Sequence, residues 1–142
     1  MTDSLSPPVL QVAAGIIVGD GKVLAACRAA ADSNDCLWEF PGGKREGSES
    51  IVDTLQREIK EELGITLKEV RPLAVVWWRS KNFTLELHGL LAKPVDIALL
   101  EARVHRVLHW CSSSELRAGT VLGSSWMPAD VLLAHAVARL IG

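Results

Sequence analysis

The sequence predicts one α/β domain over residues 1–142, folded as an α/β/α sandwich around a mixed β-sheet. Three observations support this fold class. Strand-like runs lie on both sides of a central amphipathic helix, a second amphipathic helix ends the chain, and short turn sequences join several strands. Because short turns produce antiparallel hairpins, we expect a mixed rather than a wholly parallel sheet. Residues 1–7 are polar, end at a proline and are expected to form a loose tail.

The first part of the domain predicts a hairpin followed by a third strand. Apolar runs at 9–18 and 22–28 flank Gly19-Asp20-Gly21, a sequence typical of a turn. The short run 37–40 then stops at Pro41-Gly42-Gly43. Glycines at this point would let the backbone approach a phosphate or a metal ion closely.

The central helix carries its own end signals. Ser50 suits the N-cap, with Asp53 three residues later, and Gly64 suits the left-handed residue that follows the last turn. These signals predict a helix of about 13 residues. At about 100° per residue, one side of this helix is apolar and should pack on the sheet. That stripe consists of Val52, Leu55, Ile59 and Leu63.

The runs that follow this helix predict a second hairpin. Residues 70–78 and 83–91 favour β-structure, and the polar stretch 79–82 connects them. Trp77 and Trp78 are neighbours, so they point to opposite faces of a strand. We therefore expect one of them to lie in the core and the other to be partly open.

The end of the chain predicts a further strand and two helices. Residues 95–100 fit either a loop or a helical turn, and residues 104–110 predict a strand. Ser112 with Glu115 predicts a capping box, and a final helix is expected after Pro128. The apolar stripe of this last helix consists of Val131, Leu133, Ala134, Val137 and Leu140.

Three carboxylates share one strip of the central helix. Glu58, Glu61 and Glu62 lie within about 100° of one another, beside the apolar stripe. Like charges at this spacing destabilise a helix by a few tenths of a kcal/mol per pair, so a cation is expected to offset them. Oxygen ligands on a rigid helix suit Mg²⁺ or Mn²⁺. The alternative is a solvated charged face, with Arg57 and Lys60 as ion-pair partners.

Composition narrows the class of protein. A hydrophobic content of 49% suits a globular domain, and a net charge of −2 argues against a broad nucleic-acid footprint. Cys27, Cys36 and Cys111 are odd in number and scattered, so we expect buried or idle thiols rather than a disulfide framework or a zinc site. The chain has no secretory leader pattern and no membrane-spanning apolar run, so a cytoplasmic location is expected.

The region from Gly43 to Ile65 matches a known pattern. It places Gly43, Glu49, Arg57-Glu58-Ile59, Glu61-Glu62 and Gly64-Ile65 at the spacing of the Nudix box. The chain therefore resembles the Nudix hydrolases, and residues 28–44 together with 126–130 look like the MutT branch. This resemblance implies a Nudix-type sandwich and a Mg²⁺-dependent hydrolase of phosphorus anhydrides. Its reaction would convert nucleoside triphosphates to monophosphate and pyrophosphate, as in nucleotide-pool sanitation.

The resemblance also implies a role for individual residues. Glu58, Glu61 and Glu62 would bind the metal, and one of them would act as general base through a bound water. The Gly43 carbonyl would be a further ligand, and Arg57 would orient a box carboxylate such as Glu49. The residues expected to contact the substrate are Arg28, Trp38, Phe40, His88 and Asp130. For His88, a hydrogen-bonded structural histidine is an equal alternative. The partner would be a small nucleotide, with no stable nucleic-acid or membrane binding, and the protein would be a monomer or a homodimer.

Asp130 predicts which nucleobase the protein prefers in its substrate. It falls where enzymes of this branch that act on 8-oxoguanine place an asparagine. An ionised aspartate accepts hydrogen bonds but cannot donate them, so it suits an exocyclic amino group. We therefore favour CTP, dCTP or a 5-substituted dCTP over 8-oxo-dGTP. Asp130 could instead simply complement the dipole at the start of a helix.

One departure from the family pattern leaves the general base open. Relatives often carry a Glu-His pair before the last tryptophan-containing strand, whereas this chain has Val104-His105. Either Glu101 or a box glutamate replaces the missing acid, or the enzyme works without it. Two further alternatives stay open: hydrolysis of another conjugate, such as ADP-ribose or a dinucleoside polyphosphate, and a nucleotide-binding module without catalysis.

Overall fold

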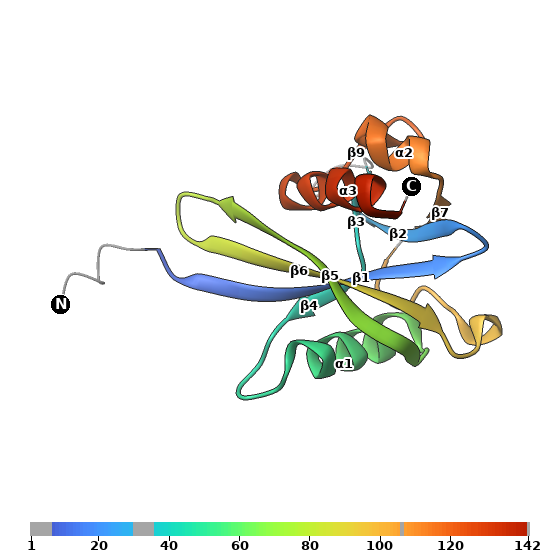
Figure 1. Cartoon of the computed structure of the whole chain (residues 1–142), viewed down its shortest axis with the longest axis horizontal. Helices are drawn as coiled ribbons and strands as arrows, with labels where there is room; N and C mark the ends of the chain where they lie inside the picture. The colour runs from blue at the N-terminus through green and yellow to red at the C-terminus, as the bar shows by residue number, and fades with distance from the viewer. Residues whose placement is uncertain (1–6, 30–35, 106, 142) are drawn as a thin grey trace.

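The computed structural model describes residues 7–29, 36–105 and 107–141, which form a sheet covered by helices on both faces (Figure 1). The predicted tail at 1–7 lies almost wholly outside the described residues. The seven-stranded sheet has the order β3-β2-β1-β6-β5, with β4 paired to β1 and β7 paired to β2. Its strands are β1 (Val9–Gly19), β2 (Lys22–Ala29), β3 (Cys36–Glu39), β4 (Gly42–Lys44), β5 (Leu67–Arg79), β6 (Thr84–Pro94) and β7 (Val107–Cys111).

The sheet is mixed, as predicted. Strands β1 and β6 run parallel, whereas the pairs β1–β2, β1–β4, β2–β3, β2–β7 and β5–β6 are antiparallel. The helices are α1 (Ile51–Leu63), the 3₁₀ turn η2 (Ile97–Leu99), α2 (Ser113–Ala118) and α3 (Pro128–Ile141). Helix α1 covers one face of the sheet, and α2 and α3 lie on the other (Figure 1). This is the predicted α/β/α sandwich.

Two apolar cores lie on the two faces of the sheet. The core on the α1 side contains Leu55, Ile59 and Leu63, all fully buried, so the predicted stripe of this helix is confirmed. The core on the α3 side contains Leu133, Ala134 and Val137. Leu140 is 57% exposed, so its place in the predicted α3 stripe is wrong. The core on this side extends along the helix only as far as Ala138.

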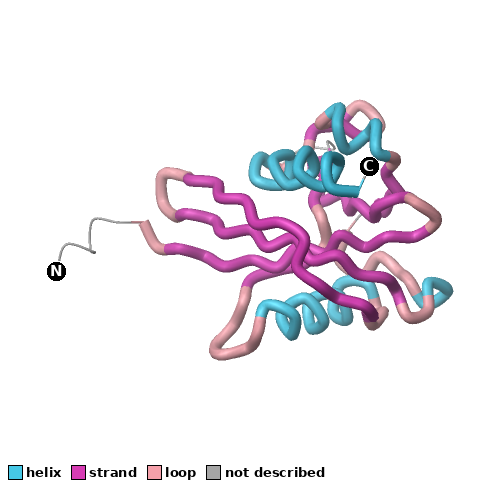
Figure 2. The backbone as a smooth tube through the Cα atoms, in the orientation of Figure 1, coloured by secondary structure: helices cyan, strands magenta, loops and turns pink. Residues whose placement is uncertain are grey.

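Both predicted hairpins are present. Asp20 and Gly21 make the β1–β2 turn with positive φ values of 51° and 75°. Strands β5 and β6 form a long twisted ribbon at the edge of the sheet (Figure 2). Trp77 is 56% exposed, whereas Trp78 packs partly buried against the α3-side core. This confirms the expectation that one tryptophan faces the core.

The glycines after β3 end that strand and also begin another one. Gly42–Lys44 is the short strand β4, which pairs with Val12, Ala13 and Ala14 of β1. A side chain at Gly42 would overlap the Ala13 carbonyl oxygen, so only glycine permits this pairing. Two further short strands were not predicted, β8 (Thr120–Val121) and β9 (Ser124–Ser125), which pair with each other.

The strand predicted for 104–110 begins later than expected, at Val107. The residues before it are held at the end of α1 instead. Backbone N–H groups of Glu101 and Arg103 donate to the carbonyls of Leu63 and Glu62 at 3.1 and 3.0 Å. The last carbonyls of a helix need partners, and this contact draws the segment out of strand geometry.

The expectation of idle thiols is wrong for two of the three cysteines. Cys27 of β2 and Cys36 of β3 form a disulfide, with Cα atoms 5.4 Å apart. Strand pairing, rather than a recognisable spacing, brings them together: Cys27 lies opposite Trp38, and Ala29 lies opposite Cys36. Cys111 is free and buried, as expected.

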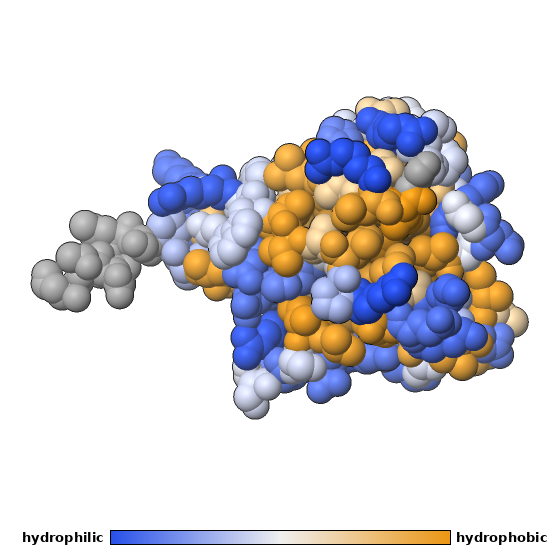
Figure 3. Space-filling model, viewed as in Figure 1, coloured by the Kyte–Doolittle hydropathy of each residue, from blue (hydrophilic) through white to orange (hydrophobic). Residues whose placement is uncertain are grey.

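One face of the molecule exposes apolar side chains between α3 and α1 (Figure 3). A hollow of about 430 Å³ lies by the end of α3, lined on its apolar side by Val18, Val70, Leu91, Ala92 and Ile141. This hollow contains no residue of the predicted site. Among the described residues, no helix combines the length and apolar character required to cross a membrane.

Candidate active site

Helix α1 is built as its end signals predict. The Ser50 side chain accepts a hydrogen bond from the Asp53 backbone N–H at 3.0 Å, and Gly64 adopts the left-handed conformation, with φ 73°. The buried apolar stripe fixes the rotation of the helix on the sheet. Glu58 and Glu62 are thereby held on one edge of α1, one turn apart.

Strand β4 meets this edge of α1. A Cβ atom on Gly43 would overlap the carboxyl group of Glu58, so the absence of a side chain lets the two segments touch. Gly43 itself pairs with Ala13 in the sheet. The backbone of the predicted ligand loop is thus held directly beside a predicted ligand carboxylate.

Arg57 organises the acidic side chains around it. Its guanidinium donates to Glu49 at 2.7 Å and to Glu58 at 2.8 Å, and it lies 3.6 Å from Glu61. The hydrogen bond from Arg57 lowers the pKa of Glu49 to about 2, with help from the Glu46 backbone N–H. The orienting role predicted for Arg57 toward Glu49 matches this geometry.

Glu62 is the most constrained of the box carboxylates. Its side chain is only 6% exposed, and its Oε1 atom has no hydrogen-bond partner among the residues that the structure describes. Burial, with a smaller contribution from the neighbouring Glu58 carboxyl, raises the pKa of Glu62 to about 8. Two acids share one buried edge, so a cation here would relieve both the repulsion and the unpaired oxygen.

Glu61 faces outward by comparison. Its side chain is 60% exposed and its contact is with Arg57. The buried Glu62 does not fit the alternative of a solvated charged face, and Arg57 ties the exposed Glu61 to the same group of carboxylates as Glu58.

Two residues beside the box were not among the predicted site residues. His105 is buried, and its Nε2 atom lies 2.8 Å from Glu39 Oε2 and 3.7 Å from Glu62 Oε1. Glu39 also accepts from Arg28 at 3.2 Å. The sequence signal in this region was that Val104-His105 departs from the Glu-His pair of the family pattern. That signal marked the segment as unusual, but it did not predict that His105 lies beside Glu39 and Glu62.

A second group of predicted residues lies on the α3 side of β3. Phe40 donates its backbone N–H to Asp130 Oδ1 at 3.0 Å, and its ring lies 4.7 Å from that of Trp126. Trp38 is buried, and its indole N–H donates to the Val121 carbonyl at 2.9 Å. Phe40 and Asp130 are therefore adjacent, whereas Trp38 packs in the core behind them.

Burial, with a smaller contribution from the charge of Glu39, raises the pKa of Asp130 to about 7. The Phe40 N–H works in the opposite direction because it stabilises the carboxylate. The side chain is thus ionised in only part of the molecules at neutral pH. The premise that Asp130 acts purely as an acceptor holds only above that pH.

The other two predicted substrate contacts, Arg28 and His88, interact with other side chains. Arg28 is 55% exposed and pairs with Glu39. His88 shares the strand face of Leu90, which packs on the α1 side, and it contacts Glu86 at 2.7 Å. This contact favours the alternative of a hydrogen-bonded structural histidine.

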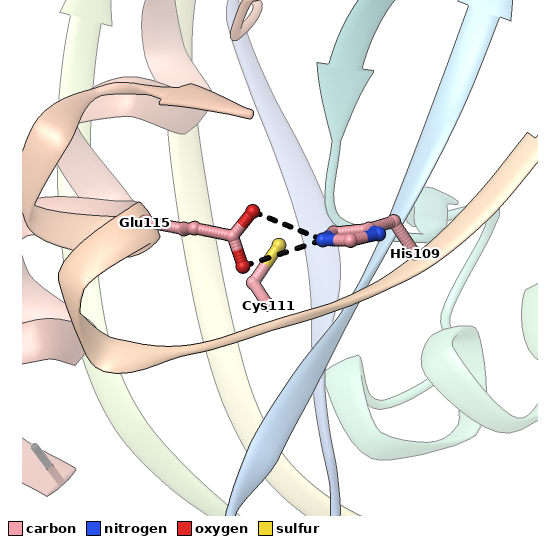
Figure 4. A group of neighbouring side chains, drawn as sticks. All are labelled: His109, Cys111 and Glu115. Carbon is pink, nitrogen blue, oxygen red and sulfur yellow. Dashed lines mark hydrogen bonds and ion pairs between the residues drawn. The ribbon is translucent and has the colours of Figure 1, made fainter. Parts of the chain in front are cut away.

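A separate cluster of potential metal ligands has a structural explanation. His109, Cys111 and Glu115 lie together at the start of α2 (Figure 4). Glu115 completes the predicted capping box with Ser112, and His109 Nε2 lies 3.0 Å from the Glu115 carboxylate. Burial raises the pKa of the Cys111 thiol to about 12, which disfavours the thiolate a metal would need.

Comparison with known proteins supports the resemblance found in the sequence. The chain matches the NUDIX domain family over residues 9–139. It is 36% identical to the CTP pyrophosphohydrolase of Escherichia coli (strain K12) over 132 residues, which cover 93% of each chain. The 8-oxo-dGTP diphosphatase of the same organism is 43% identical over 58 residues, 40% of this chain and 45% of that protein. The solution structure of the E. coli ORF135 protein has a TM-score of 0.78 at 37% identity, covering 95% of this chain and 92% of that one.

Proposed function

Because the chain belongs to the NUDIX family and is a hydrolase of phosphorus anhydrides, we propose that it cleaves nucleoside triphosphates to a monophosphate and pyrophosphate. The observation that carries this proposal is the pair Glu58 and Glu62. They crowd one buried edge of α1, beside a backbone segment that approaches Glu58 only because Gly43 has no side chain. A surface helix without a ligand has no need for such a pair.

The donor set fits a hard divalent ion. Glu58, Glu61, Glu62 and the Gly43 carbonyl would hold Mg²⁺ or Mn²⁺, because all four supply oxygen ligands and Glu62 Oε1 lacks a partner within the described parts of the chain. The bound ion would neutralise phosphate charge and lower the pKa of the attacking water. The chain's own contribution is to fix the carboxylates: Arg57 orients Glu49 and Glu58 from one side.

We assign the general base to the box glutamates rather than to Glu101. The Glu101 side chain is engaged with Arg103 at 2.6 Å. Its backbone is tied to the last turn of α1, at Leu63. Glu58 and Glu61, by contrast, both contact Arg57, beside the edge where the metal would bind.

For the nucleobase of the substrate, we propose cytosine, so that CTP, dCTP or a 5-substituted dCTP is the preferred substrate. Phe40 N–H donates to Asp130 Oδ1, and an exocyclic amino group would donate to the other carboxyl oxygen. The similarity to a CTP pyrophosphohydrolase over 93% of the chain agrees with this choice. Because the pKa of Asp130 is about 7, its protonated form would add a donor, and this favours 8-oxo-dGTP as the second candidate.

The test is a comparison of hydrolysis rates for CTP, dCTP, 5-methyl-dCTP, 8-oxo-dGTP and the ordinary dNTPs with Mg²⁺, with pyrophosphate release as the readout. Glu61→Gln should remove most of the activity without loss of folding. The matched control is Glu69→Gln, because Glu69 is another exposed carboxylate in an ion pair, with Lys93 at 3.8 Å. Failure on every triphosphate alongside turnover of ADP-ribose would redirect the assignment to nucleotide conjugates, and tight binding without turnover would indicate a binding module.

We further propose that the protein acts on free nucleotides as a monomer or a homodimer, and that it works in the cytoplasm. The net charge of −2 supports free nucleotides rather than nucleic acid as substrate. In a reducing compartment, Cys27 and Cys36 would be present as two thiols on paired strands.

A further inference from the structure

His105 is a buried polar side chain beside the proposed metal site. Its side chain has no exposed surface, and its Nε2 atom lies 2.8 Å from Glu39 Oε2 and 3.7 Å from Glu62 Oε1. A carboxylate only accepts hydrogen bonds, so Nε2 must carry the proton and donate. The ring therefore directs one N–H group toward two acids that come from different elements, β3 and α1.

The local backbone explains how the ring reaches this place. Glu101 and Arg103 bond to the carbonyls of Leu63 and Glu62 at the end of α1, at 3.1 and 3.0 Å. The Arg103 side chain adds a hydrogen bond to the Lys60 carbonyl at 3.3 Å. The segment that carries His105 is thus hydrogen-bonded to the last turn of the helix that carries Glu62, which places the imidazole beside that carboxylate.

The contacts form a continuous chain from the surface to the helix. Arg28 donates to Glu39, Glu39 accepts from His105, and His105 faces Glu62. Among the described residues, neither Glu62 Oε1 nor His105 Nδ1 has a hydrogen-bond partner, and the 3.7 Å from His105 Nε2 to Glu62 Oε1 is a contact longer than a hydrogen bond. Within the part of the chain that the structure describes, the imidazole is the donor that lies between Glu39 and Glu62.

We infer that His105 is a positioning residue, which fixes the Glu62 carboxylate for the divalent ion and keeps Glu39 separated from it. This inference rests on the proposed function, because it assumes that the α1 carboxylates bind a metal. It concerns the position of an N–H donor and not the charge of the ring. A neutral side chain that places a donor near Nε2 should therefore replace histidine.

Three substitutions test this inference. His105→Gln places an amide nitrogen near the position of Nε2, His105→Asn places it near Nδ1 instead, and His105→Leu removes the donor. The readouts are the Mn²⁺ dissociation constant, measured by EPR on the protein without nucleotide, the kcat and KM for CTP, and the thermal unfolding midpoint in EDTA. His109→Leu is the matched control, because it breaks another histidine–carboxylate contact, to Glu115, on the neighbouring β7.

We expect His105→Asn and His105→Leu to weaken Mn²⁺ binding by about 10- to 100-fold and to lower kcat in parallel, as loss of a residue that orients a ligand typically does. His105→Gln should recover most of both losses, and His109→Leu should keep the wild-type Mn²⁺ affinity. A purely structural histidine would lower the unfolding midpoint in all three variants while leaving Mn²⁺ affinity unchanged, which would overturn the inference. The comparison of glutamine with asparagine decides the matter even if His105→Leu does not fold.

Failure of the underlying function gives a different result. If the wild-type protein neither binds Mn²⁺ nor hydrolyses triphosphates, both the proposed function and the role of His105 are wrong. If the wild type does both and the asparagine variant matches it in Mn²⁺ affinity, only the role of His105 is wrong.

Discussion

Binding of a divalent ion should release a proton from Glu62. Burial and the neighbouring Glu58 raise the pKa of Glu62 to about 8, so the metal-free protein holds this proton through the neutral range. A carboxylate ligand must be deprotonated, so metal and proton compete for it. With a pKa of about 8, roughly 99% of the molecules are protonated at pH 6 and about half at pH 8. Apparent metal affinity should therefore rise by about 50-fold between these pH values and level off above them.

The assay is a Mn²⁺ titration followed by EPR at several pH values and constant ionic strength. Calorimetry in two buffers of different ionisation enthalpy counts the released protons: close to one per ion at pH 6.5, and clearly fewer at pH 8.5. Glu62→Gln, which has no proton to lose, should bind more weakly and with little dependence on pH. An affinity that stays constant from pH 6 to 8 in the wild type, or binding without proton release, would refute the assignment of Glu62 as a buried ligand.

Three further predictions concern other parts of the structure. Gly43→Ala should lower both Mn²⁺ affinity and kcat by about tenfold or more, because its methyl group would displace the Glu58 carboxyl; a variant with wild-type values in both titration and turnover would contradict the close contact. Asp130 has a folded pKa of about 7 against an ordinary value of 3.8, so it stabilises the fold at pH below 4, and up to about 4 kcal/mol of this is lost as pH rises through 7. Urea unfolding should therefore show that the wild type loses more stability from pH 4 to pH 8 than Asp130→Asn does, and parallel pH profiles for the two proteins would speak against the burial. Ser112→Ala removes the N-cap of α2 and should cost about 1 kcal/mol in the same unfolding assay with little change in kcat; an unchanged midpoint would show that the cap contributes nothing.

The elements that sequence reasoning predicted well are those with local signals. Helix α1 runs from Ile51 to Leu63 as its cap residues indicate, and Ser112 caps α2 as predicted. The β5–β6 ribbon followed from alternation and a polar connection. In each case the deciding contacts lie within a few residues of one another, so a single sequence contains them.

The parts that could not be predicted depend on contacts between distant residues. His105 lies next to Glu39, 66 positions away in the chain, and only the anchoring of its segment on α1 brings them together. The Cys27–Cys36 disulfide likewise depends on the register of β2 against β3. Alternation assigned His88 to one strand face, but it could not say which helix covers that face.

The pairing of Gly43 with β1 limits how the backbone of the site can move. Binding loops are usually the most mobile parts of a protein. The segment that contains Gly43 is instead the strand β4, which is hydrogen-bonded to β1, a central strand of the sheet. To shift Gly43 away from Glu58, the protein would have to open the pairing of β4 with β1. Nucleotide and metal should therefore arrive at a backbone that is already in place, and adjustment during turnover should fall to side chains such as the exposed Glu61.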